Sequence, residues 1–190
     1  MQTKIASMTD KAIEQCMRRT GMAVLAASLF AGSAAAMAQS QFEEDFDDKD
    51  KPWQEIAIQL PAQPKAENLL PFNVSATSTQ NFTIDAESVS VGTDGVIRYT
   101  LVSTSEGGAR NVSYEGIRCE SFERKLYAFG QQNGTWSRSR RDQWEPINFQ
   151  AANGYHAALA KDYFCQEKTV AGTAEEMVKR IRYNRTLKPY

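Results

Sequence analysis

The residues that could perform catalysis are few in this chain, and their spacing keeps them apart. His156 is the only histidine among 190 residues. A serine triad needs a histidine as its general base. Asp162 follows six residues later, about 240° around a helix, and no G-x-S-x-G segment is present to supply the nucleophile. We therefore expect His156 to be a structural histidine, at the surface or half-buried.

A metal site is also disfavoured by spacing. Cys119, Cys165 and His156 could in principle bind zinc, but His156 and Cys165 fall in one expected helix. They would lie on opposite sides of it and roughly 13 Å apart along its axis, whereas zinc ligand atoms lie about 2.0–2.3 Å from the metal. Neither a P-loop nor a G-x-G-x-x-G segment occurs. We expect no metal and no cofactor.

Paired carboxylates could support hydrolysis without a histidine. No spacing selects a pair among the available residues, which are Asp85, Glu87, Glu115, Glu120 and Asp142. Glu115 shares strand parity with Ile117 and Cys119, so it is expected to face inward. A raised pKa would then mark it as a site residue; pairing with a neighbouring arginine is the interpretation that the pattern favours.

Two stretches carry the candidate binding residues. Residues 110–119 (RNVSYEGIRC) contain Arg110, Tyr114, Glu115 and Arg118, and a deep pocket gathering them would favour a ligand or a reaction. Residues 136–144 (WSRSRRDQW) contain Trp136 and Trp144, which could stack on sugar rings. The alternative for this second stretch is a solvated loop whose tryptophans cap the sheet, and that is the interpretation we favour.

The elements that must position these residues read as an α+β domain. Short apolar alternations and Asp-Gly or Asn-Gly turns at 92–95 and 132–134 predict an antiparallel meander of about six strands. A Gly-Gly turn at 106–108 joins the two longest strands, and Gly116 indicates a bulge or a close approach. The alternating runs are 56–60, 72–76, 82–84, 89–91, 96–104, 110–119 and 124–129.

Two C-terminal helices, 155–165 and 174–183, should pack on this sheet. The second begins with a capping box, with Thr173 as the N-cap and Glu176 at N3. Its apolar residues form one stripe along the helix. The stripe consists of Ala174, Met177, Val178 and Ile181.

The N-terminus reads as an export signal. Residues 1–38 combine basic residues, an apolar run and a small-x-small cleavage pattern that ends at Ala38, although translation could also start at Met8 or Met17. Residues 39–52 form an acidic stretch that we expect to be a disordered arm, and residues 53–190 a single domain. No transmembrane segment is expected after cleavage.

Export makes a disulfide the expected state of the two remaining cysteines, Cys119 and Cys165. The bond would staple the first helix to the strand that ends at Cys119, and would stabilise the fold by about 4 kcal/mol. Two buried free thiols are the alternative. Asp162, on the sheet-facing arc of the same helix, is expected to pair with Arg118 or Arg124.

Charge excludes one partner class. The chain has 22 Lys and Arg against 23 Asp and Glu, a formal net charge of −1. A dedicated nucleic-acid binder carries a strongly basic surface, so nucleic acid is not an expected partner.

Several runs resemble the CNP-like family of exported proteobacterial envelope proteins. The likeness covers about residues 51–180, is most specific at 108–119 (GARNVSYEGIRC), and implies an exported domain without implying a reaction. A weaker resemblance to surface-adhesin E-like domains lies in Ile84-Asp85, Ser88 and the strand that ends at Cys119. The other family-like runs are 51–55 (KPWQE), 67–72 (ENLLPF), 82–85 (FTID), 98–101 (RYTL) and 126–130 (LYAFG).

Together these observations predict a periplasmic domain, free or held at the outer membrane by protein contacts. The favoured function is a non-enzymatic protein-interaction or structural module with an envelope partner. A small-ligand or glycan-binding domain is the first alternative and a histidine-independent carboxylate hydrolase the second. Whether the protein is an enzyme stays open, and the sequence does not specify the oligomeric state.

Overall fold

A computed structural model describes residues 52–76, 78–151 and 154–188. The predicted signal at 1–38 lies outside the described residues, as does the acidic arm except for Pro52. The description below therefore concerns the predicted domain.

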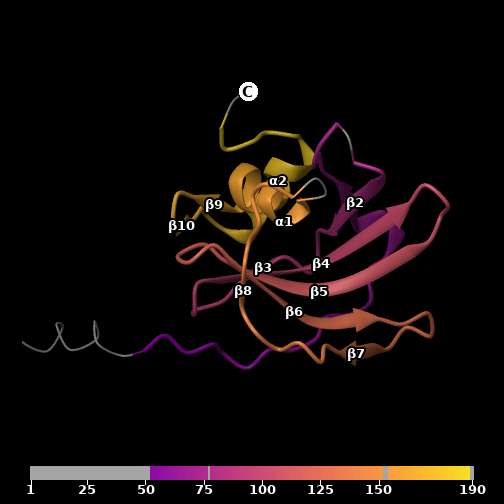
Figure 1. The fold of residues 1–190 in the computed structure, drawn as a ribbon, viewed down its shortest axis with the longest axis horizontal. Coiled ribbons are helices and arrows are strands. Elements are labelled where there is room, and N and C mark those ends of the chain that lie inside the picture. The colour runs from indigo at the N-terminus through magenta and orange to yellow at the C-terminus, as the bar shows by residue number, and fades with distance from the viewer. Residues whose placement is uncertain (1–51, 77, 152–153, 189–190) are drawn as a thin grey trace, which may run out of the picture. The chain divides into compact units, whose positions relative to one another are not determined.

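An antiparallel sheet forms the centre of the fold, in the strand order β1-β2-β4-β5-β6-β7 (Figure 1). Two short strands lie off this path: β3 pairs with β4, and β8 pairs with β6. The predicted α+β class with an antiparallel meander is confirmed. The strands are β1 Leu69–Pro71, which follows a 3-10 turn at Ala66–Asn68, β2 Gln80–Asp85, β3 Ser90–Val91, β4 Val96–Ser105, β5 Arg110–Arg118, β6 Glu123–Gly130, β7 Trp136–Arg138 and β8 Glu145–Pro146.

The three predicted turns join strands as expected. Gly92 N–H donates to Val96 O at 2.9 Å between β3 and β4, and Gln131 N–H donates to Thr135 O at 2.8 Å between β6 and β7. Each turn contains a glycine with positive φ, for example Gly95 at 74° and Gly134 at 82°. Glycine adopts this region without the steric penalty of a Cβ atom.

Both C-terminal helices are present, but the first differs from the prediction. A single α-helical turn, α1 Tyr155–Ala158, continues as a π-helix at Leu159–Phe164, and Cys165 then enters a strand. The wider π turn brings four residues of the segment into the core together. They are Leu159, Ala160, Tyr163 and Phe164.

The second helix, α2 Ala174–Arg182, has the predicted capping box. The Thr173 side chain accepts from Glu176 N–H at 3.3 Å, and the Glu176 carboxylate accepts from Thr173 N–H at 2.8 Å. Before it, β9 Cys165–Gln166 and β10 Thr169–Val170 form a small hairpin that the sequence did not indicate.

The helices cover one face of the sheet (Figure 1). The larger hydrophobic core lies between them, where side chains from β2, β4 and β5 meet those of the two helices. Its most buried members include Ile84, Ile97, Tyr99, Ile117, Leu159, Phe164 and Met177.

A segment without regular structure covers the other face. Residues 53–63, which we call the N-terminal strap, were expected to contain a strand at 56–60, and that prediction is wrong. The alternation is real, because Ile58 and Leu60 pack against Tyr114 and Tyr127 in a second, smaller core. However, the strap crosses the face of the sheet instead of extending its edge, so it has no ladder partner. Likewise, the strand predicted at 72–76 lies earlier, at Leu69–Pro71.

Another side chain approaches Gly116 closely, as we expected for a glycine within a strand. A Cβ atom at this position would lie 2.6 Å from the Tyr127 hydroxyl oxygen. The bulge lies on the neighbouring strand, where the β5–β6 register shifts between Tyr114 and Glu115. The aromatic side chain of Tyr127 therefore passes directly over the glycine.

Candidate functional site

The first polar cluster surrounds Glu115, which projects from the middle of β5 toward α1. Its side chain faces inward, as strand parity predicted, and the residue is only 3% exposed. Its carboxylate accepts hydrogen bonds from Ser113 Oγ at 2.6 Å and from the hydroxyls of Tyr155 at 3.2 Å and Tyr99 at 3.3 Å. His156 Nε2 lies 2.8 Å from Glu115 Oε2.

The electrostatics of this cluster correct two expectations. Burial raises the pKa of Glu115, but the charge of His156 and the hydrogen bonds from His156, Ser113 and Tyr155 outweigh it, so the pKa is lowered from its ordinary value. The expected raised pKa is thus wrong. The expected arginine partner is also wrong: the partner is His156, forty-one positions away. Burial and the nearby Glu115 charge raise the pKa of Tyr99 well above its ordinary value.

The carboxylate of Glu115 is already fully hydrogen-bonded, and this limits the chemistry that the cluster can perform. Each carboxylate oxygen of Glu115 already accepts two contacts from groups on β4, β5 and α1. A buried charge that is paired and fully hydrogen-bonded is the arrangement expected of a structural anchor. The cluster therefore fastens α1 to the sheet, in agreement with the structural role expected for His156.

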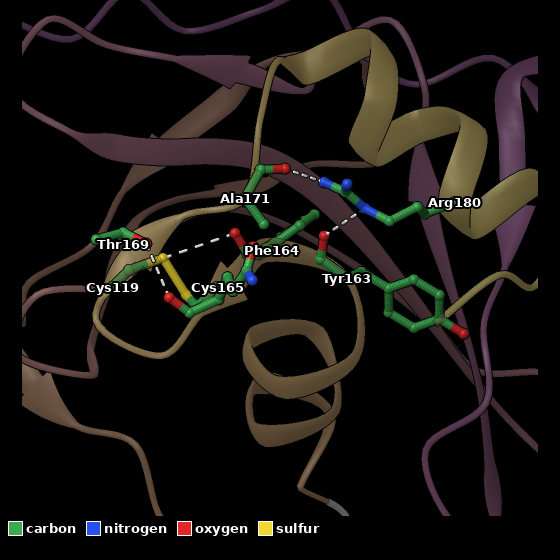
Figure 2. The surroundings of a disulfide bond; sticks show 8 residues. Cys119, Tyr163, Phe164, Cys165, Thr169, Ala171 and Arg180 are labelled. Atoms are coloured by element: carbon green, nitrogen blue, oxygen red, sulfur yellow. Dashed lines mark hydrogen bonds between the residues drawn. A yellow bond between two sulfur atoms is a disulfide. The ribbon is translucent and has the colours of Figure 1, made fainter. Parts of the chain in front are cut away.

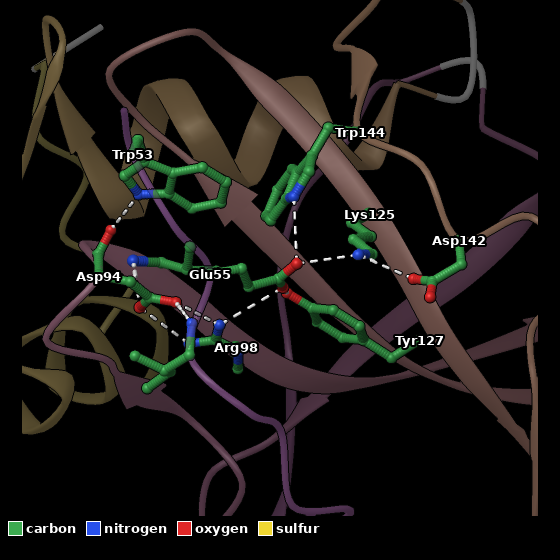
Figure 3. A network of polar contacts seen from close by, with 10 residues as sticks. Trp53, Glu55, Asp94, Arg98, Lys125, Tyr127, Asp142 and Trp144 are labelled. Atoms are coloured by element: carbon green, nitrogen blue, oxygen red, sulfur yellow. Dashed lines mark hydrogen bonds and ion pairs between the residues drawn. The ribbon is translucent and has the colours of Figure 1, made fainter. Parts of the chain in front are cut away.

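The second polar cluster lies under the N-terminal strap on the opposite face of the sheet (Figure 3). Glu55 is its centre. The carboxylate accepts from Tyr127 hydroxyl at 2.5 Å, Lys125 Nζ at 2.8 Å and Trp144 Nε1 at 3.3 Å. Arg98 Nη2 lies 3.5 Å from it. These four groups hold the strap to β4, β6 and the loop before β8.

Asp94, in the β3–β4 turn, continues this network. Its carboxylate accepts hydrogen bonds from Arg98 Nη2 at 2.6 Å and from the backbone N–H of Ile56 at 3.1 Å. Its backbone carbonyl oxygen accepts a hydrogen bond from Trp53 Nε1 at 2.8 Å. Burial raises the pKa of Asp94, but the hydrogen bonds from Arg98 and from backbone amides outweigh this effect. The pKa of Asp94 is therefore below its ordinary value.

Four of the binding residues predicted from the sequence contact this strap. Trp136 Nε1 donates to Pro61 O at 2.7 Å, and Trp144 donates to Glu55. The Arg118 guanidinium lies 4.1 Å from the centre of the Trp53 ring, and Tyr114 packs under Ile58 and Leu60. The two tryptophans thus cap the sheet, as the favoured interpretation had it.

The six candidates do not share one pocket. Glu115 faces the helices, four residues face the strap, and Arg110 lies alone at the exposed start of β5. Arg118 contacts Glu120 and Glu123, and Arg124 contacts Glu145. The pairing of Asp162 with one of these arginines stays a prediction.

The predicted cysteine pair is within bonding distance, with the Cys119 and Cys165 sulfur atoms 2.07 Å apart (Figure 2). The bond joins the residue after β5 to β9, and not to a helix as predicted. Arg180 of α2 donates to Tyr163 O at 3.1 Å and to Ala171 O. The disulfide ties β9 to the end of β5, and the guanidinium ties α2 to the backbone on both sides of the β9–β10 hairpin.

A groove along α2 was not anticipated. It has a volume of about 330 Å³ and lies between one side of α2 and the turn after β2. Ala86, Val89, Ala174 and Val178 form its apolar part. Charged side chains and an aromatic ring line the rest: Glu175, Lys179, Arg182 and Tyr183. The predicted apolar stripe of α2 contained two of these residues, Ala174 and Val178, but nothing in the sequence marked them as half-buried.

The described residues contain neither a metal-binding cluster nor a helix that could span a membrane. No group of three or more His, Cys, Asp or Glu side chains within residues 52–76, 78–151 and 154–188 is placed to hold a metal ion. None of the helices in these ranges has the length and apolarity that crossing a membrane requires.

Comparison with known proteins gives one match. The model of the CNP1-like family matches residues 48–182. No curated protein and no solved structure matches the chain significantly. The match spans most of the chain, including every strand of the sheet, the disulfide and the whole of α2. The protein belongs to the CNP1-like family.

Proposed function

We propose that this chain is an exported, non-enzymatic module of the cell envelope that binds another protein through the groove along α2. The observation that carries the proposal is the groove itself, in which Ala86, Ala174 and Val178 are only partly covered. Tyr183, at the end of the helix, is 64% exposed, although it is a large aromatic residue. Exposed apolar surface bordered by charge is typical of protein-interaction sites.

The shape of the groove favours a short segment of polypeptide as the occupant. The nine residues of α2 extend over about 13 Å at a rise of 1.5 Å per residue. About four residues of extended chain cover the same length. One or two apolar side chains of such a segment would reach Val89 and Val178.

The charged residues that line the groove predict which residue of the partner segment lies beside its apolar side chain. Glu175, Lys179 and Arg182 line the groove, and none of them forms an ion pair with another described residue. The two cations lie toward the C-terminal end of α2, beside Tyr183. We therefore expect the partner segment to carry an acidic residue next to its apolar side chain, so that it meets Lys179 or Arg182.

The hydrolase alternative receives less support. Two carboxylates must flank one bond, about 5–9.5 Å apart, in a glycosidase-like mechanism. The buried Glu115 and the half-buried Glu55 lie on opposite faces of the sheet, and each accepts several hydrogen bonds. They cannot approach one substrate bond from both sides.

The direct test places a photoreactive amino acid at Tyr183 in the full chain and irradiates intact cells. Arg140, exposed and outside the groove, is the matched control position. We expect one protein adduct specific to position 183, reduced at least tenfold when Lys179→Glu and Arg182→Glu are added. Adducts identical at both positions, or unaffected by the charge reversal, would exclude the groove as a docking site.

Export is tested separately. The native protein should be recovered from the periplasmic fraction, and its N-terminal sequence should begin at Gln39. Recovery from the cytoplasmic fraction with the initiating methionine retained would contradict the envelope location and leave the groove experiment to be judged alone.

A further inference from the structure

We propose that the protein segment in the groove along α2 carries a run of acidic residues beside its apolar side chain, one for each of three cations. The third cation is Arg185, which extends the site beyond the groove. This inference rests on the proposed function, because it names the chemistry of the partner at that same site. The other two cations are Lys179 and Arg182.

The sign of the charge changes along the C-terminal part of the chain. Glu175 and Glu176 lie in the first turn of α2, and residues 177–190 contain no Asp or Glu. Cations in the last turn of a helix stabilise it through the helix dipole, but this effect falls off within that turn. It therefore does not account for Arg185. The basic residues of 177–190 are Lys179, Arg180, Arg182, Arg185 and Lys188.

Two of these basic residues lie outside the site. Arg180 is about 160° around α2 from Arg182, and its guanidinium donates to two backbone carbonyl groups, one of them that of Tyr163 at 3.1 Å. The residue before Lys188 donates its N–H to Asp162 O at 2.8 Å, so the backbone at this point lies beside the π-helix. Neither cation is placed beside the groove.

The other three cations lie around Tyr183. Lys179, Arg182 and Tyr183 line the groove together, and the Arg185 guanidinium lies 5.9 Å from the centre of the Tyr183 ring. All three cations are exposed, and none of them forms an ion pair with another described residue. One bound segment that covers Tyr183 can therefore meet all three.

Glu175 restricts the class of anion that fits. It lines the groove near the start of α2, whereas the cations lie toward the end of the helix. A uniformly anionic surface, such as a bilayer of acidic lipids, would bring like charge against Glu175, which is unfavourable. A polypeptide can place an apolar side chain beside Val89 and Val178 and confine its carboxylates to the cationic end. We therefore infer a protein segment as the occupant.

The spacing and the strength of exposed ion pairs favour a run over a single acidic residue. Positions three apart on a helix have Cβ atoms about 5–6 Å apart, close to the ~7 Å between every second residue of an extended segment. Lys179 and Arg182 have this helix spacing. Because one exposed ion pair changes affinity by about fivefold at most, strong discrimination requires a carboxylate for each cation.

A graded set of synthetic peptides tests this inference. Each fluorescent peptide contains one apolar residue, drawn from Leu, Ile, Val and Phe, followed by none, one, two or three Asp residues, with Ser in the remaining places. The folded protein is titrated into each peptide, and fluorescence anisotropy gives the dissociation constant. We expect the affinity to increase with every added Asp, by at least tenfold from none to three, and the increase to diminish at high salt.

Two variants assign the third carboxylate. Arg185→Gln should remove the gain from the third Asp and leave the affinity of the peptides with no Asp within twofold of the wild type. Arg141→Gln changes an exposed arginine in the loop between β7 and β8. It is the matched control and should change no affinity.

The outcomes separate this inference from the proposed function. No binding of any peptide, equal affinities across the graded set, or an Arg185→Gln variant that behaves as the wild type would overturn the acidic run. Crosslinking at position 183 would still decide whether the groove docks a protein. Vesicles of phosphatidylcholine and phosphatidylglycerol form the last arm, and we expect no binding to them. Vesicle binding that is lost when Lys179, Arg182 and Arg185 are all changed to Gln would assign the cations to lipid headgroups and overturn the inference.

Discussion

His156 Nε2 lies 2.8 Å from Glu115 Oε2, and this contact joins the first turn of α1 to the middle of β5. Removing one partner of a buried pair leaves the other without compensation, at a cost of about 3–5 kcal/mol. We expect His156→Ala to lower the free energy of unfolding by about 3 kcal/mol, measured by chemical denaturation at neutral pH.

A double-mutant cycle provides the control for that prediction. Glu115→Gln removes the charge with little change in shape, so His156→Ala should cost much less in this background. A coupling energy of at least about 1 kcal/mol is expected for residues in direct contact. Additive effects would contradict the pairing of the two residues.

Acid should unfold the protein through the same carboxylate. The pKa of Glu115 is lowered in the folded state, from an ordinary value of 4.5. A lowered carboxyl pKa contributes stability that is present above the unfolded-state pKa and is lost as pH falls through the folded-state pKa. The free energy of unfolding should therefore decline as pH decreases below about 4.5. Asp94 adds to this decline, because its pKa is lowered too.

Unfolding curves at a series of pH values, for the wild type and for Glu115→Gln, measure how much the Glu115 carboxylate contributes to the loss of stability in acid. The acid-side slope should be smaller in the variant. Glu120→Gln, at a largely exposed position, is the matched control and should keep the wild-type slope. Equal slopes in all three proteins would show that Glu115 has no part in acid unfolding.

The glycine under Tyr127 should tolerate no side chain. In Gly116→Ala the new methyl would meet the Tyr127 hydroxyl at 2.6 Å, and Glu55 holds that hydroxyl from above. Overpacking of this kind costs about 1–3 kcal/mol. Gly107→Ala is the control, since its nearest contact would be Ser105 Oγ at 4.0 Å. Thermal denaturation of the two variants should separate them, and equal midpoints would refute the close approach.

Reduction of the disulfide should cost more than any of these substitutions. Cys119 and Cys165 are 46 positions apart, and opening a loop of this length costs about 4 kcal/mol in the chain-entropy model. Denaturation with and without reductant measures the difference, with a Cys119→Ser, Cys165→Ser double variant as the control. A double variant as stable as the oxidised wild type would contradict the bond's contribution.

Local patterns sufficed for much of the sheet. The strands predicted around 82–84, 96–104, 110–119 and 124–129 are present with small shifts, because β-branched residues and glycine turns act within a few positions. The capping box of α2 is equally local. Segment 56–60 shows the limit: its alternation indicates a half-buried extended chain, but only the tertiary fold decides whether a strand lies beside it.

The candidate site was less accessible to sequence reasoning. Strand parity placed Glu115 inside, yet nothing near it in the chain indicates His156, because the packing of α1 brings them together. The sequence groups Ala174, Met177, Val178 and Ile181 into one stripe of α2. Met177 and Ile181 are buried, but Ala174 and Val178 lie only half-covered beside the groove, a difference that depends on how the folded helix packs.

The affinity of the purified full-length protein for its crosslinked partner tests the central claim most directly. We predict that Tyr183→Ala combined with Lys179→Glu raises the dissociation constant at least tenfold, while Phe129→Ala, at the other exposed aromatic position, leaves it within twofold of the wild type. A dissociation constant that is unchanged by the α2 variant, or raised equally by both variants, would contradict docking at α2.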